Sequence, residues 1–374
     1  MSEYIRLDEA CILNMGQSPE SSSYNEGGSG LPFFQGNADF GEMYPNARIW
    51  CDKPIKIVEE NTLLISVRAP IGALNFSDTK SCIGRGLAGI SPNPDYDIKY
   101  IYYCLKGKHN ELNTKGTGST FKAISKNALG ETLVRRLDKE KQREIVSILD
   151  KVSSIIAGRN KQLEQFDILI KARFVEMFGD PKSNPKGYKK KLLKDTCRVV
   201  TGNTPSRAVK AYYGDYIEWI KTDNIVSGTL NPTTASECLS EEGMKVGRTV
   251  EKNSILMACI AGSIASIGRV CVTDRSVAFN QQINAVVPEE YDYLFLYVML
   301  QMSKEYLIEE INMALKGILS KSKLEEKQFI VPPKELQEQF ADFVHQVDKS
   351  KVAVQKSLEE AQLLFDSLMQ QYFG

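Results

Sequence analysis

The sequence predicts a mixed α/β (α+β) protein made of two pseudo-repeats, in each of which a globular unit is followed by a long α-helix. Three observations lead to this fold class. The second half of the chain repeats the first, apolar residues recur at helical spacing before each Phe-Gly pair, and short apolar runs broken by glycine or proline precede each helix. Each helix offers one apolar seam, so we expect the two helices to pair as an antiparallel coiled coil. The alternative is an oligomer in which each helix pairs with another chain.

An internal repeat relates the two halves of the chain. At an offset of 195 residues and without a gap, Leu129 aligns with Leu324 and Phe178-Gly179 aligns with Phe373-Gly374. Closer to the N-terminus the offset changes by several residues, as loops of different length would cause. The repeat sets the expected domains: a globular unit 1–137, a long helix 138–180, a second globular unit 181–331 and a second long helix 332–374.

Both helical segments carry start and stop signals. Asp138 is the expected N-cap of the first helix, and Pro332-Pro333 is a rigid entry to the second. Phe178-Gly179 and Phe373-Gly374 supply the last apolar contact and the C′ glycine of each helix. Apolar residues at coiled-coil spacing predict the pairing seam: Ile145, Ile148, Val152, Leu163, Phe166 and Phe178, then Phe340, Phe343, Val347, Leu358, Phe365 and Phe373, with Ile155 and Leu169 continuing the pattern.

The globular units carry strand signals, such as the runs NTLLISVRAP and NSILMACIAG. Apolar helix candidates follow in each unit, IKYIYYCLKG in the first and YLFLYVMLQMSKEYLIEEI in the second. A lysine-rich stretch from Pro181 to Lys194 joins the first long helix to the second unit. This stretch is either a solvated linker or an edge that contacts phosphates.

Composition narrows the class of protein without naming a ligand. The 374 residues hold 47 basic and 47 acidic side chains, so a nucleic-acid surface would have to arise from the distribution of charge. Eight cysteines without a C-x-x-C pair indicate reduced thiols. Because no apolar run is long enough for a bilayer and the N-terminus lacks a secretory leader, we expect a cytoplasmic protein.

The sequence lacks the usual motifs of catalysis. The closest approach to a phosphate-binding loop, from Gly262 to Gly268, lacks both the spacing and the lysine. Asn93-Pro94-Asp95-Tyr96 resembles an adenine methyltransferase tetrapeptide, but its third position is charged where that motif has proline, which favours a turn. With His109 and His345 as the only histidines, neither a metal site nor a catalytic triad is expected.

Several segments resemble the specificity (S) subunits of type I restriction-modification systems. LDKEKQREIVSILDKV and VPPKELQEQFADFVHQVDKS are similar to the repeated helices of that family, and LPFFQGNADFG, GSTFKAISK, WIKTDNI and AFNQQINAVVP are similar to its target recognition domains. The resemblance implies a non-catalytic subunit whose two target recognition domains each bind one half of a split, asymmetric DNA target. It implies that the helices act as spacers that set the gap and dock the methylating subunits.

The resemblance also implies the partners. These are double-stranded DNA, two methylating (M) subunits, and the endonuclease/translocase (R) subunits. S-adenosylmethionine, ATP and Mg would then be bound by the partner subunits, and this chain would bind no cofactor. A two-headed adaptor that binds proteins and not DNA is the alternative function.

Candidate DNA contacts are polar or basic side chains on loops. Arg85 stands between two glycines that would let backbone approach DNA, and its guanidinium can bind guanine or phosphate. At an offset of 196 its place is taken by the amides of Asn280 to Gln282, and at an offset of 186 Lys221 to Asn224 align with Gln35 to Ala38. The candidates are Gln35, Asn37, Arg85, Lys115, Ser119, Thr120, Lys122, Lys221, Asp223, Asn224, Asn280, Gln281 and Gln282.

Each candidate could instead serve the fold. Arg85 could be a structural arginine in a twisted strand, and the amides could satisfy buried backbone groups. The segment from Thr114 to Lys122 could hold phosphates with its hydroxyls and lysines, or it could be a plain loop.

Overall fold

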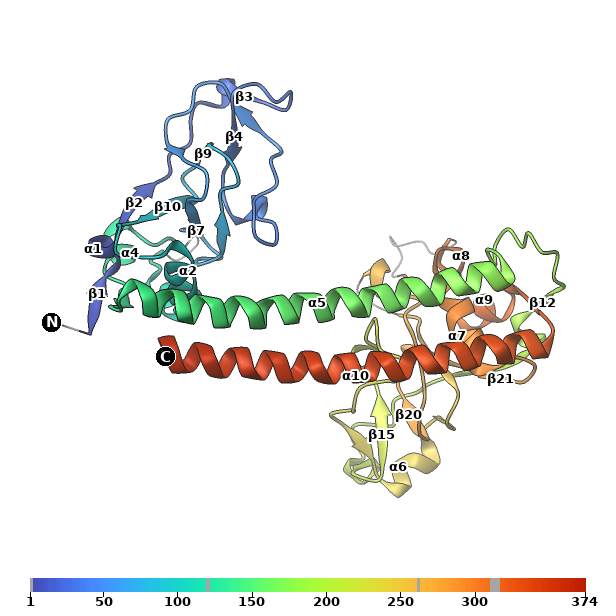
Figure 1. The fold of residues 1–374 in the computed structure, drawn as a ribbon. Helices are drawn as coiled ribbons and strands as arrows, with labels where there is room; N and C mark the ends of the chain where they lie inside the picture. The colour runs from blue at the N-terminus through green and yellow to red at the C-terminus, as the bar shows by residue number, and fades with distance from the viewer. Residues whose placement is uncertain (1–2, 119–121, 261–262, 310–316) are drawn as a thin grey trace. The chain divides into compact units, whose positions relative to one another are not determined.

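The computed structural model describes residues 3–118, 122–260, 263–309 and 317–374. The chain forms two compact units (Figure 1). Unit 1 combines Met1–Ala157 with Leu358–Gly374, and unit 2 is Gly158–Ser357. The helices α5 (Lys139–Phe178) and α10 (Lys334–Phe373) are each 40 residues long, and the chain passes between the units inside each of them. None of the helices in these described ranges combines the length and apolar character needed to cross a membrane.

Unit 1 contains two sheets and a short ladder. The first sheet is antiparallel with the order β2-β10-β7-β8, and the second has the order β3-β5-β4-β9-β6, in which β4 and β9 run parallel. β1 pairs with β11. The strands are β1 (Tyr4–Arg6), β2 (Cys11–Met15), β3 (Tyr24–Asn25), β4 (Leu31–Phe34), β5 (Trp50–Cys51), β6 (Ile57–Val58), β7 (Leu63–Ser66), β8 (Leu74–Phe76), β9 (Ser81–Ile83), β10 (Leu87–Pro92) and β11 (Leu133–Arg135).

Unit 2 repeats this topology strand for strand. Its sheets have the orders β13-β21-β18-β19 and β14-β16-β15-β20-β17, again with one parallel pair, β15 with β20, and β12 pairs with β22. The strands are β12 (Lys190–Leu192), β13 (Cys197–Thr201), β14 (Tyr213–Gly214), β15 (Ile217–Ile220), β16 (Cys238–Leu239), β17 (Thr249–Val250), β18 (Ile255–Ala258), β19 (Val270–Val272), β20 (Val277–Phe279), β21 (Ile283–Pro288) and β22 (Gln328–Ile330). The predicted pseudo-repeat of α+β units is confirmed.

Short helices accompany the sheets of each unit. Unit 1 has α1 (Leu7–Ala10), α2 (Ile98–Gly107), α3 (His109–Lys115) and α4 (Lys126–Gly130). Unit 2 has α6 (Glu241–Val246), α7 (Tyr293–Met302), α8 (Lys304–Ile308) and α9 (Lys321–Glu325). The first apolar segment predicted as a helix is α2. The second, predicted as one helix over 293–311, is divided at Ser303 into α7 and α8, and its last two residues lie outside the described ones.

Each long helix has one buried glutamine, and the two glutamines occupy equivalent positions in the repeat. Gln142 in α5 accepts a hydrogen bond from the backbone N–H of Asp97 (2.8 Å), and Gln337 in α10 accepts one from Asp292 (2.9 Å). Asp97 and Asp292 are the N-caps of α2 and α7. Each glutamine therefore fixes the start of a short helix against a long one, and a buried amide without these partners would be costly.

The predicted seam is buried or half-buried at every position, but a third helix shares it. In unit 1, Phe373 of α10 packs against Tyr100 of α2, with ring centroids 5.7 Å apart. In unit 2, Phe178 of α5 contacts both Phe295 of α7 (4.8 Å) and Phe340 of α10 (5.5 Å). Since the start of α5 packs with the end of α10 in unit 1, and the reverse holds in unit 2, the antiparallel pairing is confirmed.

Two of the predicted seam extensions are wrong. Ile155 and Leu169 are about half exposed, at 48% and 47%. Leu149 and Phe174 are fully buried instead. The reason is the third helix: α2 and α7 cover part of each long helix, which moves the buried face away from the stripe that a two-helix pair would need.

The lysine-rich stretch closes the end of α5. Gly179 takes a left-handed conformation (φ 78°), as a C′ glycine should. The ammonium group of Lys186 then donates to the carbonyls of Glu176 (2.6 Å) and Met177 (2.9 Å), which have no partner within the helix. At least this lysine serves the helix terminus.

Candidate nucleic-acid interface

Three predicted segments of unit 1 meet at one place. Backbone hydrogen bonds join them in sequence: Gly86 N–H donates to the Gln35 carbonyl (3.1 Å), Val67 N–H to the Gly86 carbonyl (2.9 Å) and Ala69 N–H to the Lys122 carbonyl (3.0 Å). The loop after β4, the loop around Arg85 and the loop that ends at Lys122 therefore lie side by side, although they are far apart in the sequence.

A hollow of about 310 Å³ opens at this junction. The predicted candidates Gln35 and Asn37 line it. So do Arg48 and Arg68, which our sequence analysis missed. Both arginines are exposed, and no local motif marks them, because their place depends on how the loops meet. Guanidinium and amide groups are the side chains that bind base edges and phosphates.

The glycines around Arg85 have a different role from the predicted one. A Cβ atom at Gly86 would collide with the Gln35 carbonyl, and one at Gly84 would lie 3.1 Å from the Gln35 Cα atom. The glycines thus allow close packing within the protein. Arg85 itself is exposed, and its side chain makes no hydrogen bond with a described residue, so it stays a candidate contact.

Asp39 organises one side of the hollow. Its carboxylate is buried at the end of the 3₁₀ turn Asn37–Asp39 and accepts hydrogen bonds from the N–H groups of Gln35 (2.7 Å) and Gly36 (3.4 Å). Its other oxygen forms an ion pair with Arg48. An exposed arginine is therefore held in place by a buried carboxylate.

In unit 2 the equivalent 3₁₀ turn is Thr222–Asn224, and its hydrogen bonds show that the predicted alignment of the two loops is wrong by one residue. Asn224 is buried and accepts a hydrogen bond from Lys221 N–H (3.0 Å), as Asp39 does from Gly36. Lys221 and Asn224 thus correspond to Gly36 and Asp39, because unit 1 has one extra residue after its strand. The offset of 186 was wrong beyond that point. The amide of Asn224 also donates to the Thr234 carbonyl (3.2 Å), so it serves the loop.

The amides at 280–282 also serve their own loop in part. Asn280 is buried and donates to the Gln282 side chain (3.1 Å), while Gln282 N–H donates back to Asn280 Oδ1 (3.1 Å). Gln281 is exposed and bonded to the hydroxyl of Thr204. Of the three, Gln281 is the one placed to reach a ligand.

Lys221 lies in a basic cluster on an aromatic pair. Arg207 lies 4.4 Å above the ring of Tyr213 and 5.2 Å from that of Trp219, and both Arg207 and Lys221 pair with Glu237 (2.7 and 3.1 Å). The hydrogen bond from Arg207 is the main reason that the pKa of Glu237 is lowered. Our sequence analysis missed Arg207. The aromatic pair has a counterpart in unit 1, where Tyr24 stacks on Phe33 with ring centroids 4.7 Å apart.

The remaining candidate residues differ in their exposure and in the contacts that they make. Asp223 and Lys122 are exposed. Lys115 is half-buried and forms an ion pair with Glu111 (2.7 Å), so it supports α3. Ser119 and Thr120 lie outside the described residues.

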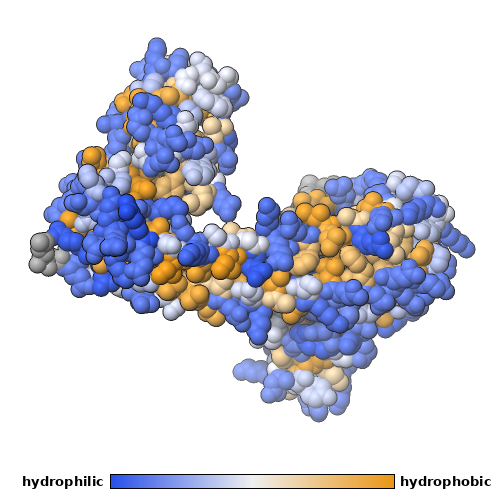
Figure 2. Space-filling model, viewed as in Figure 1, coloured by the Kyte–Doolittle hydropathy of each residue, from blue (hydrophilic) through white to orange (hydrophobic). Residues whose placement is uncertain are grey.

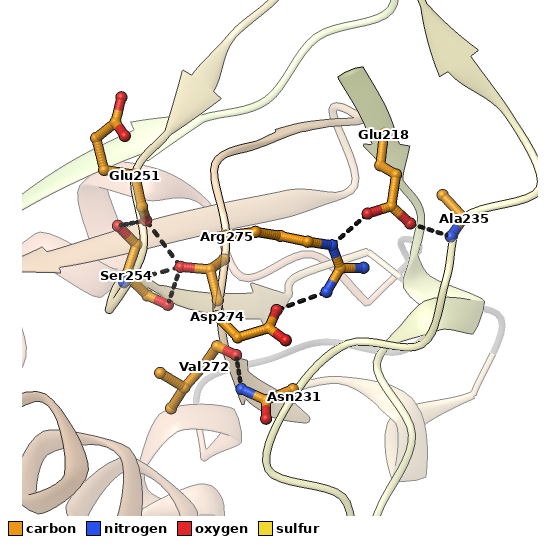
Figure 3. Close-up of polar contacts among 9 residues, drawn as sticks. Glu218, Asn231, Ala235, Glu251, Ser254, Val272, Asp274 and Arg275 are labelled. Atoms are coloured by element: carbon orange, nitrogen blue, oxygen red, sulfur yellow. Dashed lines mark hydrogen bonds and ion pairs between the residues drawn. The ribbon is translucent and has the colours of Figure 1, made fainter. Parts of the chain in front are cut away.

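A separate polar network braces unit 2 (Figure 3). Arg275 joins Glu218 of β15 to Asp274, and Glu218 also accepts a hydrogen bond from Ala235 N–H (2.8 Å). The hydrogen bond from Arg275 is the main cause of the lowered pKa of Glu218. Because every charge in this network has a partner, we assign it to the fold.

Comparisons with known proteins agree with this organisation. The family model for the type I restriction modification DNA specificity domain matches residues 2–165 and 185–363. The putative type I restriction enzyme MjaX specificity subunit of Methanocaldococcus jannaschii is 42% identical over 154 residues, which are 41% of this chain and 36% of that protein. The MjaIX specificity subunit of the same organism is 24% identical over 341 residues, 84% of this chain and 77% of that protein.

Solved structures share the fold. An S subunit of a type I restriction-modification system from M. genitalium superposes with a TM-score of 0.65 at 17% identity, covering 99% of this chain and 96% of that one. A chain from a structural study of the assembly and conformational transition of a type I system gives 0.58 at 15% identity, covering 99% and 97%.

Proposed function

Because the chain belongs to the family of the type I restriction modification DNA specificity domain, we propose that its two units each read one half of a split DNA target. In this role the chain is a non-catalytic specificity subunit, and the chemistry is carried out by its partners. S-adenosylmethionine, ATP and Mg are then bound by methylating and endonuclease subunits.

The observation that carries the proposal is that the two units place different side chains at equivalent backbone positions. Arg68 and Ile260 hold the same place, since each forms an antiparallel bridge with the equivalent residue of the other loop, Ala123 and Ile318. One unit has a cation there and the other has an aliphatic side chain. Two readers of different sequences need this kind of difference on a shared frame.

A second observation supports docking of two copies of one partner. Ile168-Leu169 in α5 and Leu363-Leu364 in α10 are equivalent at the offset of 195, and all four side chains are exposed, at 64%, 47%, 71% and 52%. Figure 2 shows apolar side chains gathered along part of the long helices. An exposed apolar pair that recurs in both repeats fits two equivalent sites for methylating subunits.

Sequencing the methylome of cells with and without this chain tests the proposal. We expect one bipartite motif, with two defined halves and a fixed gap, to lose its methylation when the chain is absent. If every modified motif persists, the chain does not direct methylation, and an adaptor role would replace the proposal.

A further inference from the structure

We infer, on the basis of the proposed function, that one turn in each unit presents a specificity-determining side chain to DNA. The turns are residues 84–87, which lead from β9 into β10, and residues 280–283, which lead from β20 into β21. Their second residues, Arg85 and Gln281, are called the tip residues below. The inference deepens the proposed function by naming the position in each unit that decides which base pair is preferred.

The two turns have the same length and the same backbone hydrogen bonds. In each turn the fourth residue donates to the carbonyl of the first, Leu87 to Gly84 (3.0 Å) and Ile283 to Asn280 (3.1 Å). Four further N–H groups donate to carbonyls in the same pattern: Gly84 to Phe34 (2.8 Å), Gln17 to Ile83 (3.0 Å), Gly16 to Leu87 (2.9 Å) and Val67 to Gly86 (2.9 Å) in unit 1, and Asn280 to Ile220 (3.0 Å), Asn203 to Phe279 (3.1 Å), Gly202 to Ile283 (3.0 Å) and Cys259 to Gln282 (2.8 Å) in unit 2. The extra residue of unit 1 follows β4 and lies outside the turn. The tip residues therefore stand at equivalent places on equivalent backbone.

Each turn buries its neighbours and exposes the tip residue. From 81 to 90 every residue except Arg85 is buried. From 277 to 286 every residue except Gln281 is buried or half-buried. The backbone is thus fixed by the fold, and the tip side chain is the part of the turn that a ligand can reach.

The two tip side chains differ in chemistry. The guanidinium of Arg85 offers donors only, whereas the amide of Gln281 offers a donor and an acceptor. A hydroxyl group contacts each tip residue: the Ser18 hydroxyl accepts a hydrogen bond from Arg85 N–H (3.3 Å), and the Thr204 hydroxyl donates to Oε1 of Gln281. Because base edges in the major groove differ in their donors and acceptors, these two side chains favour different bases.

Both turns lie beside a surplus of positive charge. Two cations accompany one carboxylate at each place: Arg48 and Arg68 with Asp39 in unit 1, and Arg207 and Lys221 with Glu237 in unit 2. Gly86 of the first turn lines the same hollow as Arg68, and Asn280 of the second turn donates to the carbonyl of the residue before Lys221.

This surplus of charge suits phosphates, and phosphate contacts position a protein on the duplex. The phosphates are the same in both half-sites, so a tip that served them would be best filled by a cation in both units. Gln281 carries no charge, which favours bases as the partners of the tip residues.

The test exchanges the two tip side chains in the full chain, in its own cells. A strain without the endonuclease subunit is used, so that sites with altered methylation are not cut. In the methylome we expect Arg85→Gln to change the preference for one base pair in one half-site by roughly 5- to 100-fold, and Gln281→Arg to do so in the other half-site. Lys80→Gln is the matched control, because it removes an exposed cation that precedes β9, at the end of that strand away from the turn, and that pairs with Glu59 (2.8 Å). It should leave the motif unchanged.

Each other outcome counts against the inference in its own way. An unchanged motif in both variants would refute the reading role and leave the proposed function intact. If Arg85→Gln lowers methylation equally at all sites and the salt dependence of DNA binding falls by about one ion, Arg85 contacts phosphate. If no motif depends on the chain at all, the proposed function itself has failed. Should an exchange lower the temperature of thermal unfolding, Arg85→Ala and Gln281→Ala take its place, and each should abolish the preference at the same position.

Discussion

The two Phe-Gly ends offer the sharpest test of the packing, because the sequence makes them equivalent and the structure does not. Phe178 is fully buried, and the centroid of its ring lies 5.1 Å from that of Phe174, 4.8 Å from that of Phe295 and 5.5 Å from that of Phe340. Phe373 is half-buried, and the ring it meets on another helix is that of Tyr100, at 5.7 Å.

Replacing each phenylalanine by alanine should therefore cost different amounts of stability. A buried Phe→Ala change costs about 3–5 kcal/mol, since it removes apolar burial and leaves a cavity among the rings. For Phe373→Ala we expect about 1–2 kcal/mol, because water already reaches the side chain and the neighbours can close over the gap.

Hydrogen exchange of the full chain, read separately for the two units, measures both costs. Phe178→Ala should lower the free energy of opening of amides in unit 2, and Phe373→Ala that of amides in unit 1. Equal losses for the two variants, or a loss from Phe178→Ala that appears in unit 1, would refute the assignment of Phe178 to the core of unit 2.

Three further predictions concern the helices and a buried charge. Adding one turn, about four residues, to both long helices after Ala157 and after Ser357 lengthens them by about 6 Å and should widen the gap in the methylated motif by about two base pairs, with both halves unchanged; an unchanged gap would mean that the helices do not set it. Leu363→Glu should weaken co-purification of a methylating subunit, whereas Val352→Glu, at a similarly exposed position whose counterpart in the first repeat is the small Ala157, should not; equal effects would count against the docking pair. The pKa of Asp348 is raised by burial, so its carboxylate destabilises the folded state above that pKa and is harmless below the unfolded value of about 3.9. Asp348→Asn should thus raise the urea midpoint at pH 7 and leave it unchanged at pH 3, and a lower midpoint at pH 7 would contradict the assignment.

The features that the sequence predicted well are those that both repeats need. Phe178 and Phe373 recur because each closes a helix end, and at the same offset of 195 the structure adds Gln142 and Gln337, each of which holds the N-cap of a short helix. Such residues recur with a fixed offset, which a single sequence can display. The seam was predicted for the same reason.

The errors come from contacts that no local pattern encodes. Ile155 fits the heptad spacing, but the long helices pack against a third helix, which rotates the buried face. One extra residue, next to Gln35, shifted the alignment of the loops and hid the match of Asp39 with Asn224. Arg48 could not be found, because its partner Asp39 reaches it only through the folded turn.

The division of the chain has a consequence for its synthesis. Unit 1 includes Leu358–Gly374, so the ribosome must make all of unit 2 before the last strip of unit 1 exists. At roughly 5–20 residues per second, the intervening ~200 residues take about 10–40 s. During that time the apolar side chains of α2 and the start of α5 lack their cover from Phe365 and Phe373. A nascent chain of this kind keeps that apolar surface exposed to water until its final helix has docked.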